Sequence, residues 1–82
     1  MPQDPADSFA AAFGPAVVER RQHLKISQEE LSFRAEVDRS YLSAIERGLQ
    51  NPSLKLIWRL AAALETKPSK LISAAEGKMR SR

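Results

Sequence analysis

The chain has 82 residues, of which 43% are hydrophobic and 28% are charged, and it contains no cysteine. A chain of this length supports one small core, which excludes an enzyme built from separate cofactor and substrate domains. The missing thiols exclude disulfides, thiolate zinc sites and cysteine nucleophiles. The net charge is +3, and residues 53–82 carry the basic excess because they hold seven Lys and Arg residues against two Glu residues. This asymmetry is compatible with a polyanionic partner, although many domains with charged surfaces reach the same net charge.

The first residues have neither the basic nor the apolar segment of an export signal, and no apolar run reaches the roughly 18 residues that a membrane span needs. We therefore expect a cytoplasmic protein with no membrane partner. Apolar residues recur at spacings of three and four, and no segment alternates apolar and polar residues over the length of a strand. This periodicity predicts an all-α domain.

Residues 1–7 contain two prolines and two aspartates, which indicates a flexible N-terminal lead-in to a domain over residues 8–77. Ser8 can cap a short turn, but the Gly14-Pro15 pair is expected to interrupt it, because a proline belongs in the first turn of a helix. We therefore place the first helix near Pro15 to Leu24. Its inward side chains are expected to be Phe13, Val17 and Leu24.

A capping box predicts the start of the second helix. The Ser27 hydroxyl can accept from the amide of Glu30, while the Glu30 carboxylate reaches back to the amide of Ser27. The helix is expected to run from Gln28 to Ala35. Three residues further on, Asp38 offers an N-cap for a third helix. The apolar stripe of that third helix comprises Tyr41, Leu42 and Ile45.

Two further helices are expected in the C-terminal half of the chain. Asn51-Pro52-Ser53 predicts a turn with an N-cap, and Lys67-Pro68-Ser69 precedes a last helix that is expected to end at Gly77. Trp58 lies beside the apolar stripe of the fourth helix and is expected to pack in the core. Residues 78–82 form a basic tail, which is either a nonspecific phosphate contact or a solubilising end. The stripe of the fourth helix comprises Leu54, Ile57, Leu60, Ala61 and Leu64.

The strongest motif is the pair of short helices joined by three residues, over residues 28–48. Here the sequence resembles the helix-turn-helix family of lambdoid phage repressors and Cro, also called the xenobiotic-response-element type. The resemblance covers about residues 13–75 and implies a compact five-helix lambda-repressor-like DNA-binding domain, usually dimeric, that regulates transcription at an inverted-repeat operator. Its stretches are Ile26-Ser27-Gln28-Glu29-Glu30-Leu31, Tyr41-Leu42-Ser43-Ala44-Ile45-Glu46-Arg47-Gly48 and Asn51-Pro52-Ser53-Leu54.

Within this family, the run that begins Asp38-Arg39-Ser40-Tyr41 looks like the recognition helix of restriction-modification controller proteins. In a helix-turn-helix the second helix enters the major groove with its N-terminal residues facing base edges, and an arginine such as Arg39 can bind O6 and N7 of guanine together. A serine hydroxyl can bond a base or a phosphate, and an alanine methyl can contact thymine. The predicted base contacts are Arg39, Ser40, Ser43, Ala44 and Arg47.

Other roles follow from the same resemblance. It implies that the Gln28 side chain binds a phosphate, to which the amide end of its helix adds partial positive charge. A second phosphate is assigned to the start of the fourth helix, with simple capping as the alternative for Ser53. The candidates there are Asn51, Ser53 and Lys55.

The resemblance also implies one structural contact, and the shortness of the last helix predicts an interface. Arg21 and Glu46 match a family pair that forms a structural ion pair between the first and third helices. Leu71 and Ile72 of the last helix are expected to be left uncovered by the monomer and to form a dimer interface.

Two positions depart from the family pattern, which often has glycine where this chain has Lys25 and Glu36. Both positions are expected to need a positive φ, which costs a residue with a side chain about 1 kcal/mol.

We therefore predict a sequence-specific transcriptional regulator that binds double-stranded DNA as a homodimer. It is expected not to be an enzyme and to need no cofactor, metal or small-molecule ligand, since His23 is the one histidine and no catalytic pair is evident. Two alternatives stay open. An antitoxin of a toxin–antitoxin pair would use the same fold, and a protein-interaction module without DNA binding would fit residues 27–52, which hold three basic and five acidic residues.

Overall fold

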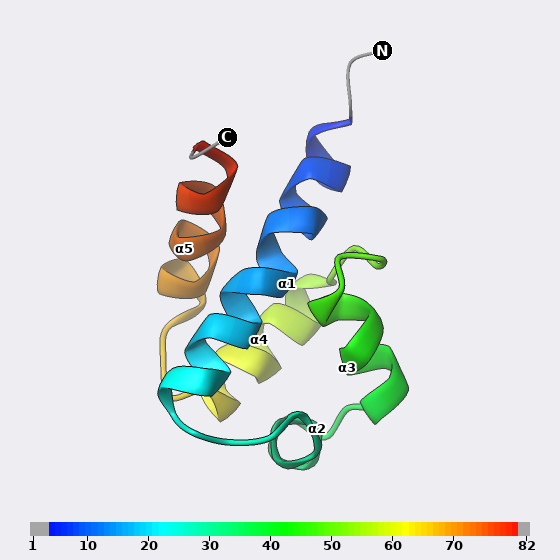
Figure 1. Cartoon of the computed structure of the whole chain (residues 1–82), viewed down its shortest axis with the longest axis vertical. Helices are drawn as coiled ribbons and strands as arrows, with labels where there is room; N and C mark the ends of the chain where they lie inside the picture. Colours follow the sequence, from blue (N-terminus) through cyan, green and yellow to red (C-terminus); the bar gives the residue numbers. More distant parts are fainter. Residues whose placement is uncertain (1–3, 81–82) are drawn as a thin grey trace.

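A computed structural model describes residues 4–80, and over this range the chain forms five α-helices and no strand (Figure 1). The all-α prediction is confirmed. The outermost parts of the predicted lead-in and tail, residues 1–3 and 81–82, lie outside the described residues. The helices are α1 (Pro5–His23), α2 (Gln28–Ala35), α3 (Arg39–Glu46), α4 (Leu54–Ala63) and α5 (Pro68–Arg80).

Three of these helices begin at the predicted N-caps. The Ser27 hydroxyl accepts from the amide of Glu30 at 3.0 Å, Asp38 caps α3, and Ser53 caps α4. The predicted capping box forms only in part, because the Glu30 carboxylate accepts from Arg34 Nε at 2.9 Å. The Glu30 carboxylate therefore binds Arg34, one turn further along α2, and does not accept from the amide of Ser27 as expected.

Helix α1 is longer than predicted. It begins at Pro5, where the Asp4 carboxylate accepts from the amide of Ala6 at 2.8 Å, and it continues through Gly14-Pro15. Proline removes one backbone N–H from the middle of a helix, but buried side chains lie on both sides of it and hold the two halves in one core. The prediction of a helix that starts near Pro15 is wrong because packing outweighs this local cost.

All five helices contribute to one core, and α5 runs alongside α1 (Figure 1). Phe13 and Val17 point inward as predicted, and Phe9 packs against Phe13 with ring centroids 5.4 Å apart. Burying a large apolar side chain contributes about 1.5 to 3 kcal/mol, so this cluster provides much of the driving force for folding. Its largest fully buried side chains are Phe13, Val17, Leu31, Leu42, Ile45, Leu60 and Leu64.

The predicted stripe of α4 is partly wrong. Leu54 is 70% exposed and Trp58 is 59% exposed, so neither side chain packs in the core, and Leu56 is buried in their place. The last helix is also longer than predicted, because α5 passes through Gly77 and ends at Arg80.

The ends of α1, α2 and α4 lead into residues with positive φ. Lys25 and Glu36 have φ of 59° and 57°, as predicted, and Glu65 also has φ of 57°. Arg20 donates from Nε to the carbonyl of Leu64 at 2.9 Å and from Nη2 to the carbonyl of Glu65 at 3.0 Å. The guanidinium therefore satisfies carbonyls at the C-terminal end of α4 and ties that end to α1.

Gly14 lies where α1 crosses the last turn of α3. A Cβ atom at this position would lie 2.5 Å from the carbonyl oxygens of Ile45 and Glu46. The close approach of α1 to α3 therefore requires glycine.

Over residues 4–80, no helix combines the length and the apolar character that crossing a membrane requires.

Candidate nucleic-acid interface

The outer face of α3 carries all five predicted base contacts. Their positions fall within an arc of about 140° around the helix, since successive residues are about 100° apart. The opposite face holds Leu42 and Ile45, which are buried, and Glu46 is buried at the edge between the two faces. Helix α3 is therefore anchored by one side and presents Arg39, Ser40, Ser43, Ala44 and Arg47 on the other.

Arg39 is exposed at the first position of α3, and no residue in the range 4–80 pairs with its guanidinium. Arg47, at the end of α3, donates weakly to the carbonyl of Ser43 at 3.4 Å. Ser40 differs from these two residues because its hydroxyl donates to the Asp38 carboxylate. The Arg39 guanidinium at this end of α3 is therefore exposed and available to bind a ligand.

The N-cap of α3 has a distinct electrostatic environment. Hydrogen bonds from the Ser40 hydroxyl and the Tyr41 amide hold the pKa of Asp38 below its ordinary value. Asp38 is therefore ionised at neutral pH, and its charge complements the positive N-terminal end of the α3 dipole.

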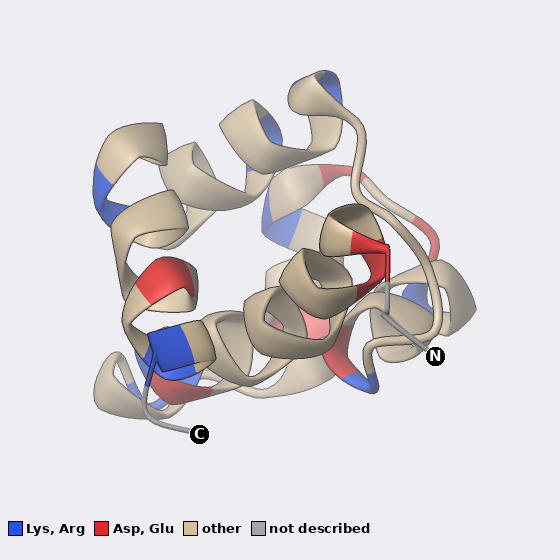
Figure 2. Ribbon diagram, turned by 90° about the horizontal axis from the view of Figure 1, so that it is seen from above, with Lys and Arg blue, Asp and Glu red and all other residues tan. Residues whose placement is uncertain are grey.

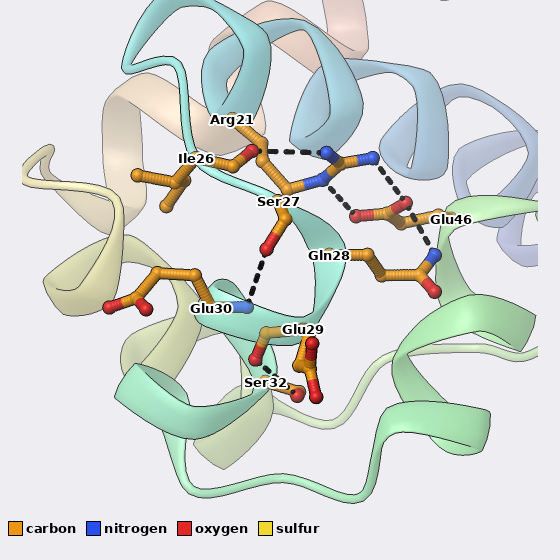
Figure 3. A network of polar contacts seen from close by, with 8 residues as sticks. All are labelled: Arg21, Ile26, Ser27, Gln28, Glu29, Glu30, Ser32 and Glu46. Atoms are coloured by element: carbon orange, nitrogen blue, oxygen red, sulfur yellow. Dashed lines mark hydrogen bonds and ion pairs between the residues drawn. The ribbon is translucent and has the colours of Figure 1, made fainter.

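A partly buried polar network joins α1, α2 and α3 (Figure 3). Arg21 binds Glu46 through two parallel contacts, Nε to Oε2 at 2.8 Å and Nη2 to Oε1 at 3.0 Å, and its Nη1 donates to the carbonyl of Ile26 at 3.2 Å. The Gln28 side chain donates to Oε1 of Glu46 at 2.9 Å. The Glu46 side chain is only 5% exposed, so these donors offset the cost of removing its charge from water.

This network limits what Gln28 can do. Its amide nitrogen carries two hydrogens and one of them is directed at Glu46, so one side-chain N–H is left for an anion, together with the backbone amides of Gln28 and Glu29, since Ser27 takes the amide of Glu30. Sequence reasoning assigned Gln28 to a phosphate alone and missed its contact with Glu46. The contact joins two helices, so no local pattern in the sequence could have indicated it.

The start of α4 forms the other side of the candidate interface. Asn51 and Lys55 are exposed, and the Ser53 hydroxyl accepts from the amide of Leu56 at 3.1 Å. A hollow of about 170 Å³ lies between α3 and α4, and Tyr41 and Arg59 line it together with Ser53 and Lys55.

Tyr41 and Arg59 were not among the predicted site residues. Tyr41 was assigned to the buried stripe of α3, but it lies at the edge of that stripe and is partly exposed. The phenol hydroxyl was the available signal, because tyrosine commonly sits with its ring packed and its polar tip in water.

Basic and acidic positions occur around the whole molecule and are not separated into two faces (Figure 2). The candidate interface is therefore defined by particular side chains on α3 and α4. In the range 4–80, no three or more His, Asp or Glu side chains are placed to hold a metal ion.

The predicted dimer residues on α5 behave differently from expectation. Leu71 is 2% exposed and belongs to the core, and Ile72 is partly buried against that core. The expectation that the monomer leaves Leu71 uncovered is wrong, because α5 packs along most of α1 and turns this side chain inward.

Two short helices joined by three residues and held by a third helix, with the outer face of the second helix left open, define a helix-turn-helix domain. A helix-turn-helix family model matches residues 17–71, which is more than half of the chain. The chain belongs to the helix-turn-helix family, and the predicted resemblance is confirmed.

Among similar proteins, control protein C.BamHI of Bacillus amyloliquefaciens is 43% identical over 47 residues, which cover 57% of this chain and 58% of that protein. This chain therefore spans less than two thirds of that relative. The crystal structure of the restriction-modification controller protein C.AhdI from Aeromonas hydrophila shares 42% identity with a TM-score of 0.74, covering 76% of this chain and 94% of that one. The crystal structure of the clp gene regulator ClgR from Corynebacterium glutamicum shares 28% identity with a TM-score of 0.84, and the match covers 88% of this chain and 77% of that one.

Proposed function

We propose that this protein is a sequence-specific DNA-binding transcriptional regulator of the restriction-modification controller kind. The observation that carries the proposal is the exposed guanidinium of Arg39 at the N-terminus of an α3 helix whose opposite face is locked into the core. A fixed helix with an unpaired arginine at its leading end suits bidentate recognition of guanine in the major groove. The likeness to C.BamHI and C.AhdI supports the same function.

Phosphate contacts complete the proposed mode of binding. Gln28 begins α2 and Lys55 lies in the first turn of α4, and both are proposed to hold backbone phosphates while α3 enters the groove. Helix N-termini favour anions, and the exposed ammonium of Lys55 adds a full charge. Such contacts fix the register of the protein on the duplex and carry no sequence information.

The proposed active form is a homodimer on an inverted-repeat operator. One recognition helix reads only about four or five base pairs, and a twofold axis doubles the length of the site and matches it to a palindrome. The proposal requires no catalytic group and no cofactor.

The proposal is tested by affinity selection from duplexes with a randomised central segment, followed by fluorescence anisotropy on the selected sequence. We expect enrichment of one sequence with twofold symmetry. Arg39→Ala should lower affinity for that sequence by about 1 to 3 kcal/mol and flatten the preference at one base pair per half-site.

The matched control is Lys70→Ala, which removes one exposed positive charge from α5 and should leave the base preference unchanged. Failure to enrich any sequence would refute the proposed function. Equal losses of affinity for selected and random duplexes in Arg39→Ala would refute the role of Arg39.

A further inference from the structure

A hollow of about 350 Å³ lies between α1 and α5, which run side by side (Figure 1). The residues of α1 that line this hollow are on the opposite side of the helix from Gly14 and Arg21, which face α3, because successive residues are about 100° apart. The hollow, called here the α1–α5 pocket, is therefore separate from the candidate DNA interface. Its lining includes Ala16, Arg20 and His23 of α1 and Lys70, Leu71 and Ala74 of α5.

The α1–α5 pocket has an apolar floor. Ala16 and Leu71 are each 2% exposed, and the small side chains of Ala16 and Ala74, one from each helix, leave the space between the helices open. The volume equals that of about twelve water molecules at about 30 Å³ each, and it lies at the lower end of the range of about 300 to 1,000 Å³ for ligand pockets. The pocket can therefore hold a molecule of about 10 to 15 non-hydrogen atoms.

The rim of the pocket carries positive charge that no acidic group offsets. Arg20 donates to two carbonyls at the end of α4, which are neutral, and no residue in the range 4–80 pairs with its Nη1 group. The exposed ammonium of Lys70 also has no partner in that range. Glu19 lines the pocket as well, but its carboxylate already binds Lys78 Nζ at 3.3 Å. The rim therefore attracts an anion.

Two other hollows of comparable size lack this combination. One, of about 350 Å³, adjoins the start of α1 and is lined by Asp7 and by no basic side chain among the described residues. The other, of about 310 Å³ between α2 and α4, is lined by two arginines, but Glu36 lines it too and Glu30 binds Arg34 at 2.9 Å. Among these three hollows of residues 4–80, the α1–α5 pocket alone places unpaired cations above a buried leucine.

We infer that the α1–α5 pocket binds a small organic anion, a carboxylate attached to a flat apolar body. Arg20 and Lys70 bind the carboxylate through charge-assisted hydrogen bonds, and the apolar body lies against Leu71 and the two alanines. The inference goes beyond the proposed DNA-binding function and does not depend on it. It differs from the expectation, drawn from the sequence, that the protein needs no small-molecule ligand.

The inference is tested by titrating isotope-labelled protein with naphthoate at constant ionic strength and following the backbone amide signals by NMR. Amides of α1 and α5 around the pocket should shift and saturate with a dissociation constant on the order of 1 mM or lower. Naphthylmethanol has the rings without the charge, and acetate has the charge without the rings. Each should bind about 10-fold more weakly or worse, because it lacks one of the two contacts.

Three outcomes of this titration would overturn the inference. They are the absence of a saturable shift with naphthoate, equally tight binding of naphthylmethanol or acetate, and shifts confined to the exposed Leu54 and Trp58 of α4.

Two pairs of variants test the position of the site. Lys70→Ala removes a rim cation and should weaken naphthoate binding by about 5-fold or more, and Ala74→Glu places a carboxylate in the pocket and should weaken it by about 10-fold or more. Their matched controls are Lys67→Ala and Ser73→Glu, which make the same changes at exposed positions that do not line the pocket and should bind naphthoate like the wild type.

Unchanged helical circular dichroism in all four variants checks folding. Lys70→Ala should keep the base preference of the wild type on DNA, because the pocket lies away from α3. If Lys70→Ala and Ala74→Glu bound naphthoate as tightly as their controls, the anion would lie outside the α1–α5 pocket and the inference would be wrong.

Discussion

Asp38 caps α3 and also holds one of the side chains on the exposed face of α3. Its carboxylate accepts from the amide and the hydroxyl of Ser40 and from the amide of Tyr41, so one residue satisfies the end of the helix and fixes a proposed base-contacting serine. Ser40 is consequently less free to reorient than Arg39. Base recognition by α3 should therefore depend on Arg39 more than on Ser40.

The depressed pKa of Asp38 leads to a prediction about acid stability. Because the folded-state pKa lies below the unfolded value of about 3.9, the contribution of Asp38 is complete above that pH and is lost as the pH falls through the folded-state pKa. The difference in free energy of unfolding between wild type and Asp38→Asn should be constant from about pH 7 to pH 5 and shrink below about pH 4. Urea unfolding at each pH measures it.

Ser40→Ala serves as the control for this prediction. It removes the hydroxyl, which contributes most to the lowered pKa of Asp38. The part of the Asp38 contribution to the free energy of unfolding that depends on pH should therefore become smaller. A difference between wild type and Asp38→Asn that does not vary with pH would contradict the assignment.

At the scale of single residues, the sequence predicted the interactions between residues that are close together in the chain. The three N-caps were predictable because each depends on residues within one turn, whereas the positive φ of Lys25 and Glu36 followed from the family resemblance, which has glycine at both positions. The exposure of Trp58 was not predictable. Apolar residues surround most of α4, so the side that faces the core depends on where the other helices lie.

At the scale of helices, α1 decides how α3 is held. Gly14 permits the backbone contact with the end of α3, and Arg21, two turns further on, binds Glu46 in the last turn of α3. The ion pair followed from the family resemblance, whereas the continuity of α1 through Pro15 did not. Local propensity argued against that continuity, and only the buried contacts on both sides of the proline explain it.

Substitution of glycine should have opposite effects in α1 and α5. Alanine usually stabilises a helix interior by about 0.5 to 1 kcal/mol relative to glycine, and Gly77→Ala in α5 should do so, because nothing lies within 4 Å of a Cβ at that position. Gly14→Ala should instead destabilise by about 1 to 3 kcal/mol, since its Cβ would overlap two carbonyl oxygens. Urea unfolding of the two variants gives both values.

If Gly14→Ala were as stable as Gly77→Ala, α1 would have to move away from α3 at little cost. The close packing of α1 against α3 would then not be needed to hold α3 in position.

At the scale of the whole molecule, the elements could be predicted better than their assembly. Three of the five helices begin directly after their predicted N-caps, because capping residues and apolar periodicity are properties of short segments. Which apolar residues remain for a partner depends on the complete packing of all five helices. Leu71 was expected to be exposed and is buried in the core, whereas Leu54 was expected to be buried and is exposed.

The last prediction combines DNA binding with assembly. Each phosphate that a protein neutralises releases counterions and contributes about 0.9 to the slope of log affinity against log salt concentration. If Lys55 binds a phosphate in each subunit of a dimer, Lys55→Ala should reduce the slope by about 1.8, whereas loss from a protein bound as a monomer should reduce it by about 0.9. The variant should also weaken binding to selected and random duplexes alike, because a phosphate contact does not read bases.

Anisotropy titrations at several salt concentrations measure this slope, with Lys70→Ala as the control for loss of an exposed charge away from the interface. An unchanged slope in Lys55→Ala would remove Lys55 from the phosphate contacts. A reduction near 0.9 would leave Lys55 in place and indicate one bound subunit. A reduction near 1.8 requires the two Lys55 side chains of a homodimer to bind the same duplex.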